Sequence, residues 1–385
     1  MRVHGLKLTA RRVKNAALVL EDGSFFLGYG FGAVGRVSGE VVFNTGMVGY
    51  VESLTDPSYH GQILTMTYPL VGNYGVPSFN VVDEWGLPAY FESDGVKVRG
   101  FVVHECCRTP SHWNSAESLD EWLRREGVPG IEGVDTRMLT KKLRVKGVML
   151  GILEVCEEGV EPDVDELLKE VKYVEDPNKR KLASEVSCRK PVSYGDGGGK
   201  RVVLIDCGVK LSILRQLLRR GAEVVRVPYG AKVDEILDYR PRGVVVSNGP
   251  GDPKSAVEVI DAVRGVLSEE LPVFGICFGN QILALACGGD TYKLKYGHRS
   301  QNQPCIDVET GRCYITSQNH GYAVSEESLC ETGLRVSFVN ANDKTVEGVR
   351  HEKLPAFSVQ FHPEHSPGPF DTEHLFDLFM NMLGD

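Results

Sequence analysis

One stretch decides the fold of this 385-residue chain: Pro272-Val-Phe-Gly-Ile-Cys277-Phe-Gly-Asn-Gln-Ile-Leu-Ala-Leu-Ala-Cys287. Its first half is a short apolar run with β-branched and aromatic residues, which favours a strand, and its second half is an apolar run that favours a helix. Gly275 and Gly279 flank the junction and, lacking a Cβ, allow neighbouring backbone to approach closely. The sequence therefore predicts that Cys277 lies where a strand turns sharply into a helix.

A cysteine on such a turn can have either of two roles. The turn pushes the side chain out of the sheet, while backbone N–H groups and the positive end of the helix dipole point towards it. A thiolate gains most from that setting, so Cys277 is a candidate nucleophile. Cysteine is also among the residue types most often buried, and the G-x-C-x-G pattern alone fits a structural core cysteine equally well.

Size and composition limit the class of protein. A chain of 385 residues predicts two domains, each with its own core. The net charge of -9 argues against nucleic acid and membrane partners, because no basic surplus is available to neutralise phosphates. The start Met1 to Lys7 lacks the apolar core of a signal peptide, and no run of about 18 apolar residues could span a membrane. We therefore expect a cytoplasmic protein.

The cysteines give no indication of a disulfide framework or a metal site. All 10 are scattered, and the only adjacent pair is Cys106-Cys107. This distribution predicts reduced core thiols, and no spacing resembles a zinc site. We expect no metal and no cofactor in this chain.

The first half of the chain is predicted to be β-rich. Lys14 to Phe31 alternates apolar and polar residues around the turn Glu21 to Ser24, which is typical of a hairpin, and Gly39 to Pro77 contains short β runs with glycine-rich turns. Ser118 to Glu126 and Val134 to Arg144 favour capped helices. The basic cluster of the second helix is either a solvated face or an anion site.

The second half has a different pattern. Pro191 to Gly199 is turn-rich and typical of a linker, so we place the boundary between domains 1–190 and 191–385. Strands then alternate with helices, which indicates βαβ units and a mainly parallel sheet of the α/β class. Ligands bind outside the carboxyl ends of such strands, where both Cys277 and the loop Asn248 to Pro253 fall. The predicted strands and helices are 201–206, 211–220, 223–227, 243–247, 257–267 and 272–277.

The loop Asn248-Gly-Pro-Gly-Asp-Pro253 has glycines that permit close backbone approach. It lacks the Lys and the following Ser or Thr of a P-loop, so we reject a nucleotide phosphate cradle. The loop is either a set of N–H donors or a plain turn.

A candidate base follows another strand-like run, Ala356 to Phe361, which is predicted to end at His362. A thiol with a pKa of about 8.5 needs a partner that takes its proton near neutrality and later returns it to a leaving amine. Glu364 could hold the tautomer of His362, although a solvated His-x-Glu turn fits the pattern as well. His320, on a predicted loop, and His365, expected to face solvent, are rival bases. We expect His320 to support substrate contact or packing.

Four motifs resemble, in chain order, those of the class I glutamine amidotransferase family, and the similarity covers residues 201–385. In that family a cysteine attacks the side-chain amide of glutamine, ammonia leaves, and water hydrolyses the thioester. The resemblance implies that Cys277 is the nucleophile, His362 the base and Glu364 its orienting carboxylate. The motifs are Ser247-Asn-Gly-Pro-Gly-Asp-Pro253, Gly275-Ile-Cys-Phe-Gly-Asn-Gln281, Gln318-Asn-His-Gly-Tyr322 and Gln360-Phe-His-Pro-Glu364.

Two further expectations concern the turn itself. The N–H groups of Phe278 and Gly251 are the expected oxyanion donors, from the geometry of the turn and the loop. Many family members have His where this chain has Asn280. Because the base role falls on His362, we expect activity to survive this difference.

The N-terminal half resembles the small chain of the carbamoyl-phosphate synthase family. The motifs are Phe43-Asn-Thr-Gly-Met-Val-Gly-Tyr50, Thr55-Asp-Pro-Ser-Tyr59, Thr67-Tyr-Pro69, Gly72-Asn-Tyr-Gly75 and Asp135-Thr-Arg-Met-Leu-Thr140, with Lys295-Tyr-Gly-His298 and Ser366-Pro-Gly-Pro369 in the second half. The family's glutamine contacts would fall on Gly46, Gly249, Gly251, Phe278, Gln281, Asn319, Gly321 and Tyr322. Some members have Ser at Gly46, so a contact there has to use the backbone.

This resemblance implies a role in arginine and pyrimidine biosynthesis. The chain would hydrolyse L-glutamine and pass ammonia to a separate large chain, which would bind ATP and a divalent metal and join ammonia to bicarbonate. Two rival functions stay open at this stage. One is the amidotransferase of another pathway, such as anthranilate or guanylate synthesis, although the motifs of the N-terminal half argue against it. The other is a non-catalytic regulatory or binding subunit.

Overall fold

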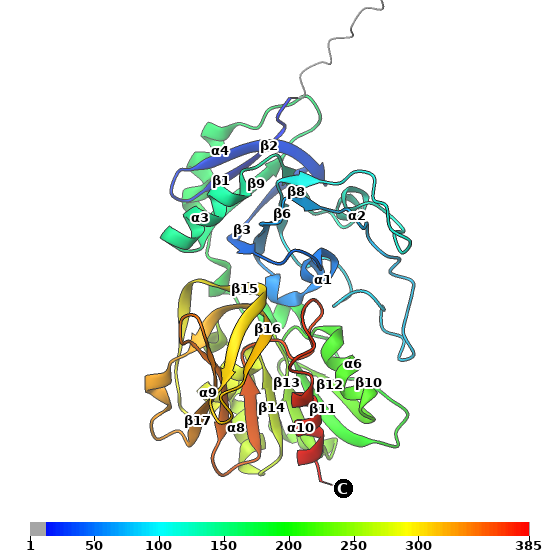
Figure 1. Cartoon of the computed structure of the whole chain (residues 1–385), viewed down its shortest axis with the longest axis vertical. Coiled ribbons are helices and arrows are strands. Elements are labelled where there is room, and N and C mark those ends of the chain that lie inside the picture. The colour runs from blue at the N-terminus through cyan, green and yellow to red at the C-terminus, as the bar shows by residue number, and fades with distance from the viewer. Residues whose placement is uncertain (1–12, 385) are drawn as a thin grey trace, which may run out of the picture.

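The computed structural model describes residues 13–384, and these form two units stacked along the long axis of the molecule (Figure 1). The expectation drawn from Met1 to Lys7 lies outside the described residues. Between residues 13 and 384, no helix has the length and apolar character needed to cross a membrane.

The N-terminal unit is a closed β-barrel, in agreement with the predicted β-rich half. Its strands are β1 (Ala16–Leu20), β2 (Phe25–Gly32), β3 (Gly35–Asn44), β4 (Gln62–Met66), β6 (Gly100–Val102), β8 (Pro129–Glu132) and β9 (Met149–Val155). The order around the barrel is β1-β2-β8-β6-β4-β3-β9. The predicted hairpin is confirmed, because β1 and β2 pair antiparallel across the turn. A small separate pair joins β5 (Leu70–Val71) to β7 (Glu105–Cys106).

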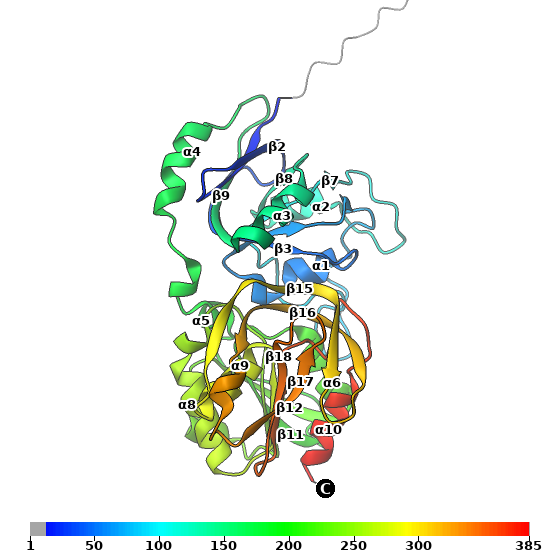
Figure 2. The same ribbon diagram turned by 60° about the vertical axis from the view of Figure 1, so that its left-hand side comes forward.

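The helices of the first half begin where the caps predict. Ser118 forms a capping box with Glu121, and the Asp135 side chain accepts a hydrogen bond from the backbone of Met138. The basic helix has a mainly exposed charged face, and its Lys142 pairs with Asp22 at 2.6 Å, as a solvated face would. The helices are α1 (Tyr50–Thr55), α2 (Leu119–Arg125), α3 (Thr136–Lys146), α4 (Val164–Glu170) and α5 (Leu182–Val186). Figure 2 shows the chain descending from α4 along the side of the first unit to α5 at the edge of the second unit.

The C-terminal unit is built on one 10-stranded sheet with the order β10-β12-β11-β13-β14-β19-β18-β16-β15-β17. The stretch from β12 to β19 in this order is parallel, as predicted. These strands are β12 (Ala222–Pro228), β11 (Lys200–Asp206), β13 (Gly243–Val246), β14 (Val273–Ile276) and β19 (Ala356–Val359). An antiparallel part, which sequence analysis did not assign, contains β15 (Thr291–Asp307), β16 (Cys313–Val324), β17 (Leu334–Asn340) and β18 (Val346–His351).

Helices cover both faces of the parallel strands. Alternate residues of β11 enter different cores: Val203 packs in the core that holds α8 and α9, and Leu204 in the core that holds α6 and α10. Burial on both faces explains why these strands read as continuous apolar runs. The helices are α6 (Leu211–Arg219), α7 (Val233–Asp238), α8 (Val257–Ser268), α9 (Phe278–Ala286) and α10 (His374–Met382).

The linker prediction is wrong for part of Pro191 to Gly199. Residues Val192–Tyr194 form β10, which pairs antiparallel with the edge of β12. Valine and tyrosine favour extended backbone, so this short run adds to the open sheet edge before the glycines form a turn. The placement of the boundary between 190 and 191 stays a prediction.

The predicted strand-to-helix turn is confirmed. Cys277 lies between β14 and α9 with φ 54° and ψ -98°, a backbone conformation that residues with a Cβ rarely adopt. A Cβ at Gly275 would lie 2.4 Å from the carbonyl oxygen of Gly279, and a Cβ at Gly279 would lie 2.2 Å from that of Val246. Both glycines are therefore required by close approach of backbone to backbone.

We expect Gly279→Ala to lower the free energy of unfolding by about 1–3 kcal/mol or more, because the new methyl group meets backbone that cannot move aside easily. Urea unfolding at equilibrium measures the change. Gly230→Ala is the matched control, since a Cβ there meets nothing within 4 Å. Equal stability of the two variants would show that the turn tolerates a side chain at residue 279.

Candidate active site

Cys277 is buried at the carboxyl end of β14, with only 2% of its surface exposed. Its thiol donates to the backbone carbonyl of Asn319 at 3.6 Å. The side-chain amide of Gln360 donates to the Cys277 carbonyl at 3.3 Å and lies 3.7 Å from the sulfur. The sulfur is thus held between β16 and the segment that follows β19.

The predicted base and carboxylate lie together beside this cysteine. His362 Nδ1 is 2.6 Å from Glu364 Oε1, so an N–H on Nδ1 donates to the carboxylate. The strand before them ends at Val359, earlier than predicted, and the backbone N–H of His362 donates to the carbonyl of Ser317 at 2.9 Å. The imidazole is therefore anchored through its backbone and through Nδ1, and its Nε2 has no hydrogen-bond partner among residues 13–384.

A buried lysine that sequence analysis missed completes the group. Lys210 Nζ donates to Glu364 Oε1 at 3.0 Å and to the carbonyl of His365 at 2.7 Å. Lys210 immediately precedes α6, and no local motif around it indicates a charge partner more than 150 residues away. Only the folded sheet brings the two residues together.

The charges of this group control one another. Burial alone would lower the pKa of His362, but the Glu364 carboxylate outweighs this effect and raises that pKa to about 10. Lys210 opposes the rise in this pKa, and Cys277 adds to it. Burial would also raise the pKa of Glu364, yet Lys210 and His362 lower it to about 2. Glu364 is therefore ionised near neutral pH, and His362 readily carries a proton.

The rival histidines have other contacts. His365 does not face solvent as predicted: its side chain is 13% exposed, and its Nε2 lies 2.8 Å from Glu373 Oε1, because the turn after His362 folds back towards the start of α10. His320 lies in strand β16 and not on a loop, and its Nδ1 is 2.8 Å from the carbonyl oxygen of Tyr322. Neither ring has a hydrogen bond to Cys277 within the described part of the chain.

A cavity opens next to Cys277 between the two units. Predicted glutamine contacts that line it are Gly249, Gly251, Gln281, Asn319, Gly321 and Tyr322. Gly46 and Phe278 are not among its lining residues. The N–H of Gly46 donates to the side chain of Asn44 at 2.6 Å, and a Cβ at Gly46 would lie 2.6 Å from Gln301 Nε2.

Three charged residues that no sequence motif predicts also line the cavity: Glu40, Lys293 and Arg299. Glu40 pairs with Lys293 at 2.6 Å across the boundary between the units. Arg299 is buried. In the sequence it is marked only by its charge, within the polar run that forms β15.

Asp56 joins the N-terminal unit to the site. Its Oδ2 accepts from Asn319 Nδ2 at 2.7 Å, and its Oδ1 accepts from Asn248 Nδ2 at 3.3 Å and from the backbone of Ser58 at 2.9 Å. Asp56 is 5% exposed, and each of these partners is a donor. One carboxylate thus binds both the glycine loop, through Asn248, and strand β16, through Asn319.

Asn280 is accommodated within the turn. Its Nδ2 donates to Gln360 Oε1 at 3.1 Å, and its Oδ1 accepts from the Ser358 hydroxyl at 2.9 Å. Asn280 is fully buried, and its bonds orient the same glutamine amide that contacts Cys277. The residue has a positioning role without contact to the sulfur.

Comparison with known protein families agrees with this geometry. Residues 18–153 match the family model described as carbamoyl-phosphate synthase small chain, CPSase domain, and residues 203–382 match glutamine amidotransferase class-I. A carbamoyl phosphate synthase small chain of Methanopyrus kandleri is 53% identical over 95% of this chain and 98% of its own length.

The chain belongs to the carbamoyl-phosphate synthase small-chain family. The Methanocaldococcus jannaschii small chain is 52% identical over 95% of this chain and 98% of its own length. A small chain of Bacillus subtilis named as pyrimidine-specific is 48% identical over 95% of each chain. The rival assignment to anthranilate or guanylate synthesis is therefore wrong, and the chain has the role of a glutamine-hydrolysing subunit.

We expect Glu364→Gln to reduce the dependence of the unfolding free energy on pH. In the wild-type chain the pKa of His362 is raised from 6.5 to about 10, so its contribution to stability is complete below pH 6.5 and is lost as pH rises through 10. The contribution of Glu364, whose pKa falls from 4.5 to about 2, is present above pH 4.5 and is lost as pH falls through 2.

Urea unfolding at several pH values between 6.5 and 10 checks this expectation. The variant lacks the carboxylate that raises the pKa of His362, so its stability should decline less steeply over this range. Glu185→Gln removes the partner of the more exposed His60, 2.9 Å away, and serves as control. Parallel curves for wild type and Glu364→Gln would contradict the assigned coupling.

We also expect Asp56→Asn to raise the KM for glutamine, with a loss of about 1–3 kcal/mol in stability, because an amide cannot accept from all of these donors. Steady-state kinetics and urea unfolding measure the two effects. Asp22→Asn, which breaks a surface pair with Lys142, should leave KM unchanged. An unchanged KM in Asp56→Asn would show that glutamine binding in the cavity does not depend on the contacts that Asp56 makes between the units.

Proposed function

We propose that this chain hydrolyses glutamine through a thioester on Cys277, with His362 as base and acid and Glu364 as the carboxylate that orients it. The observation that carries this proposal is the 2.6 Å contact between His362 Nδ1 and Glu364 Oε1, beside a cysteine held on a strand-to-helix turn with positive φ. A contact of this kind fixes the tautomer and leaves Nε2 to exchange protons with the thiol.

The reaction divides into two steps that use the same residues. In the first, His362 takes the proton of the Cys277 thiol, the sulfur forms a bond to the side-chain amide carbon of glutamine, and His362 gives that proton to the departing nitrogen as the C–N bond breaks and ammonia leaves. In the second, water adds to the thioester carbon, His362 takes a proton from that water, and the C–S bond breaks as His362 returns the proton to sulfur, which gives glutamate and the free cysteine. Expected donors to the oxyanion are the N–H groups of Phe278 and Gly251.

The cavity suits a zwitterionic amino acid. The glutamine contacts we propose are backbone groups of Gly46, Gly249, Gly251 and Gly321, with Phe278, Gln281, Asn319 and Tyr322. Glu40 and Arg299 supply charges of opposite sign in the same cavity, which is favourable for a substrate with both an ammonium and a carboxylate group.

We propose that the large chain of the synthase, bound to this chain in a heterodimer, uses the ammonia. That chain would hold ATP and the divalent metal and would make carbamoyl phosphate from bicarbonate, whereas we assign no cofactor to the catalytic site of the small chain. We further propose domains at 1–190 and 191–385 and a cytoplasmic location for the complex, with no nucleic acid or membrane partner.

Cys277→Ser in the complex with the large chain should lower glutamine-dependent synthesis by a factor on the order of 10⁴–10⁶, because nucleophile and base act as a unit. Synthesis from free ammonia should be retained, which controls for folding and assembly. Measuring carbamoyl phosphate with each nitrogen source checks both statements.

The control variant is Cys313→Ser, whose thiol is exposed in the antiparallel part of the sheet and should leave both activities intact. Retained glutamine use by Cys277→Ser would overturn the proposal. Absence of any glutaminase activity in the wild-type complex would favour the non-catalytic subunit considered above.

A further inference from the structure

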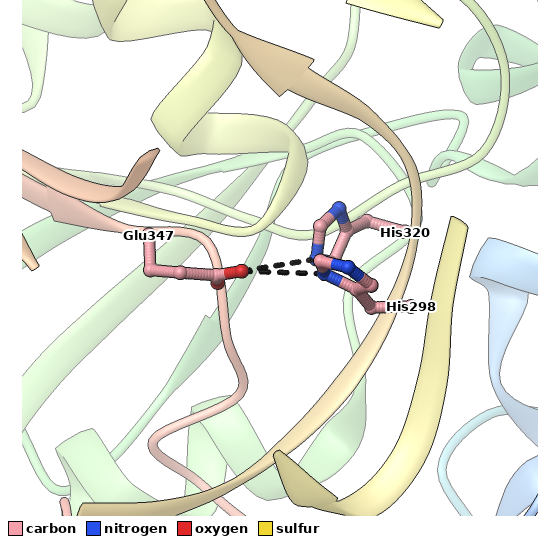
Figure 3. A group of neighbouring side chains, drawn as sticks. All are labelled: His298, His320 and Glu347. Atoms are coloured by element: carbon pink, nitrogen blue, oxygen red, sulfur yellow. Dashed lines mark ion pairs between the residues drawn. The ribbon is translucent and has the colours of Figure 1, made fainter. Parts of the chain in front are cut away.

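Three buried ligand-type side chains meet in the antiparallel part of the sheet, and His320 among them also lines the cavity beside Cys277. His298 comes from β15, His320 from β16 and Glu347 from β18, and Figure 3 shows the two rings and the carboxylate turned towards one another. One nitrogen or oxygen atom of each lies within 4.8 Å of the others. The exposed fractions are 7%, 4% and 0%, so bulk water does not solvate these atoms.

The hydrogen bonds of His320 leave a lone pair at the centre of this group. Its Nδ1 is 2.8 Å from the carbonyl oxygen of Tyr322, so the ring proton lies on Nδ1. Nε2 then has a lone pair, and it lies 3.2 Å from Gln318 Oε1.

The Gln318 amide cannot be turned around to relieve this contact. Its Nε2 donates to Glu347 Oε2 at 3.0 Å and lies 3.2 Å from both Cys305 Sγ and Thr316 Oγ1. Reversing the amide would place its oxygen against the carboxylate. Two acceptors, His320 Nε2 and Gln318 Oε1, therefore face each other.

His298 directs a second ring nitrogen to the same place. Its Nε2 lies 2.8 Å from Asp343 Oδ2, so that nitrogen carries the proton. Its Nδ1 has no hydrogen-bond partner among residues 13–384, although it lies 3.3 Å from Glu347 Oε1. The side chain is 9% exposed, so this nitrogen is an unpartnered polar atom in a nine-tenths buried ring.

We propose that His298 Nδ1, His320 Nε2, Glu347 Oε1 and Gln318 Oε1 form a binding site for a divalent transition-metal cation of the zinc type. Ligand atoms of His298, His320 and Glu347 converge, Gln318 Oε1 lies 3.2 Å from the His320 atom, and a cation is the partner that can satisfy such acceptors. Ligands at about 2.0–2.2 Å in a tetrahedral site lie roughly 3.3–3.5 Å apart. The observed separations of 3.3 Å for His298 and Glu347, 3.9 Å for His320 and Glu347, and 3.2 Å for His320 and Gln318 are close to that range.

The outer contacts have the form expected around a metal. A histidine that binds a metal usually donates its other N–H to a carboxylate or a carbonyl, as His298 does to Asp343 and His320 to Tyr322. Imidazole and carboxylate ligands suit zinc better than magnesium or calcium, which prefer oxygen alone. Glu347 Oε1 also accepts from Asn340 and Thr345, both at 3.3 Å, which orients the carboxylate.

Such a cation would have a structural role. It would connect β15, β16 and β18 directly behind Asn319, whose carbonyl accepts from Cys277. The sequence predicts no metal site, because its ligands are far apart along the chain and have no recognisable spacing. The inference does not depend on the proposed reaction, and its readouts do not require glutaminase activity.

Zinc chloride is the probe for the test. The full chain is treated with chelator, loaded with excess zinc chloride, dialysed and analysed for metal by mass spectrometry, and one zinc per chain is expected. Glu347→Gln and His298→Gln should reduce the content to below about a tenth of an equivalent, whereas Glu185→Gln, which alters the His60 pair, should keep one. Asp343→Asn should weaken zinc affinity by about 10- to 100-fold.

Two further measurements keep the test decisive. Cobalt(II) substituted for zinc should give a four-coordinate absorption spectrum without a thiolate charge-transfer band, which distinguishes this site from metal on the cysteines. Zinc should raise the Tm of the wild type and leave that of Glu347→Gln unchanged; if that variant does not fold, Asp343→Asn gives the comparison. No bound zinc, or equal zinc in wild type and variants, would overturn the proposal. The positive charge within this group would then be a proton on His298.

Discussion

The geometry of the candidate site depends on a lysine ammonium buried next to a carboxylate. Lys210 and Glu364 are 3.0 Å apart, and their side chains are 3% and 0% exposed. Removing two charges from water costs several kcal/mol per ion unless both are fully paired. Burial opposes the charge on Lys210, but Glu364, Glu92 and Asp56 outweigh that effect and keep its pKa raised. Two of these carboxylates belong to the N-terminal half, so the lysine needs both units of the protein.

This requirement explains why the barrel is part of the site. Glu92 accepts from the Ser212 backbone at 3.1 Å, and Asp56 accepts from Asn319 at 2.7 Å. A glutamine amidotransferase domain alone would leave Lys210 with fewer compensating charges and Asn319 without its acceptor. The first unit thus stabilises the charge state of Glu364, which in turn holds His362 ready to carry a proton.

The sequence predicts those parts of the molecule whose physical cause is local. The turn at Cys277 needs two glycines within a few residues, and His362 lies two residues from its carboxylate, so both are visible without the fold. The hairpin, the capped helices and the parallel strands have equally local patterns. Lys210, Asp56 and Gln360 act on partners far along the chain, and nothing near them indicates these contacts. The antiparallel strands β15 and β16 were missed because their many polar residues hide the apolar alternation that indicates a strand, whereas β17 shows that alternation and was left unassigned.

Those polar residues are explained by what the strands connect. Asn319 offers its carbonyl to the Cys277 thiol and its side chain to Asp56, while its neighbours Gln318 and His320 turn to the opposite side of β16, towards Glu347. Successive residues of a strand point to opposite faces, so one strand can serve both sides at once. A change in the buried group behind β16 would therefore move the backbone carbonyl that faces the sulfur. The polar strand thus joins the cysteine to the N-terminal unit through Asn319 and reaches the buried carboxylate through the residues on either side of it.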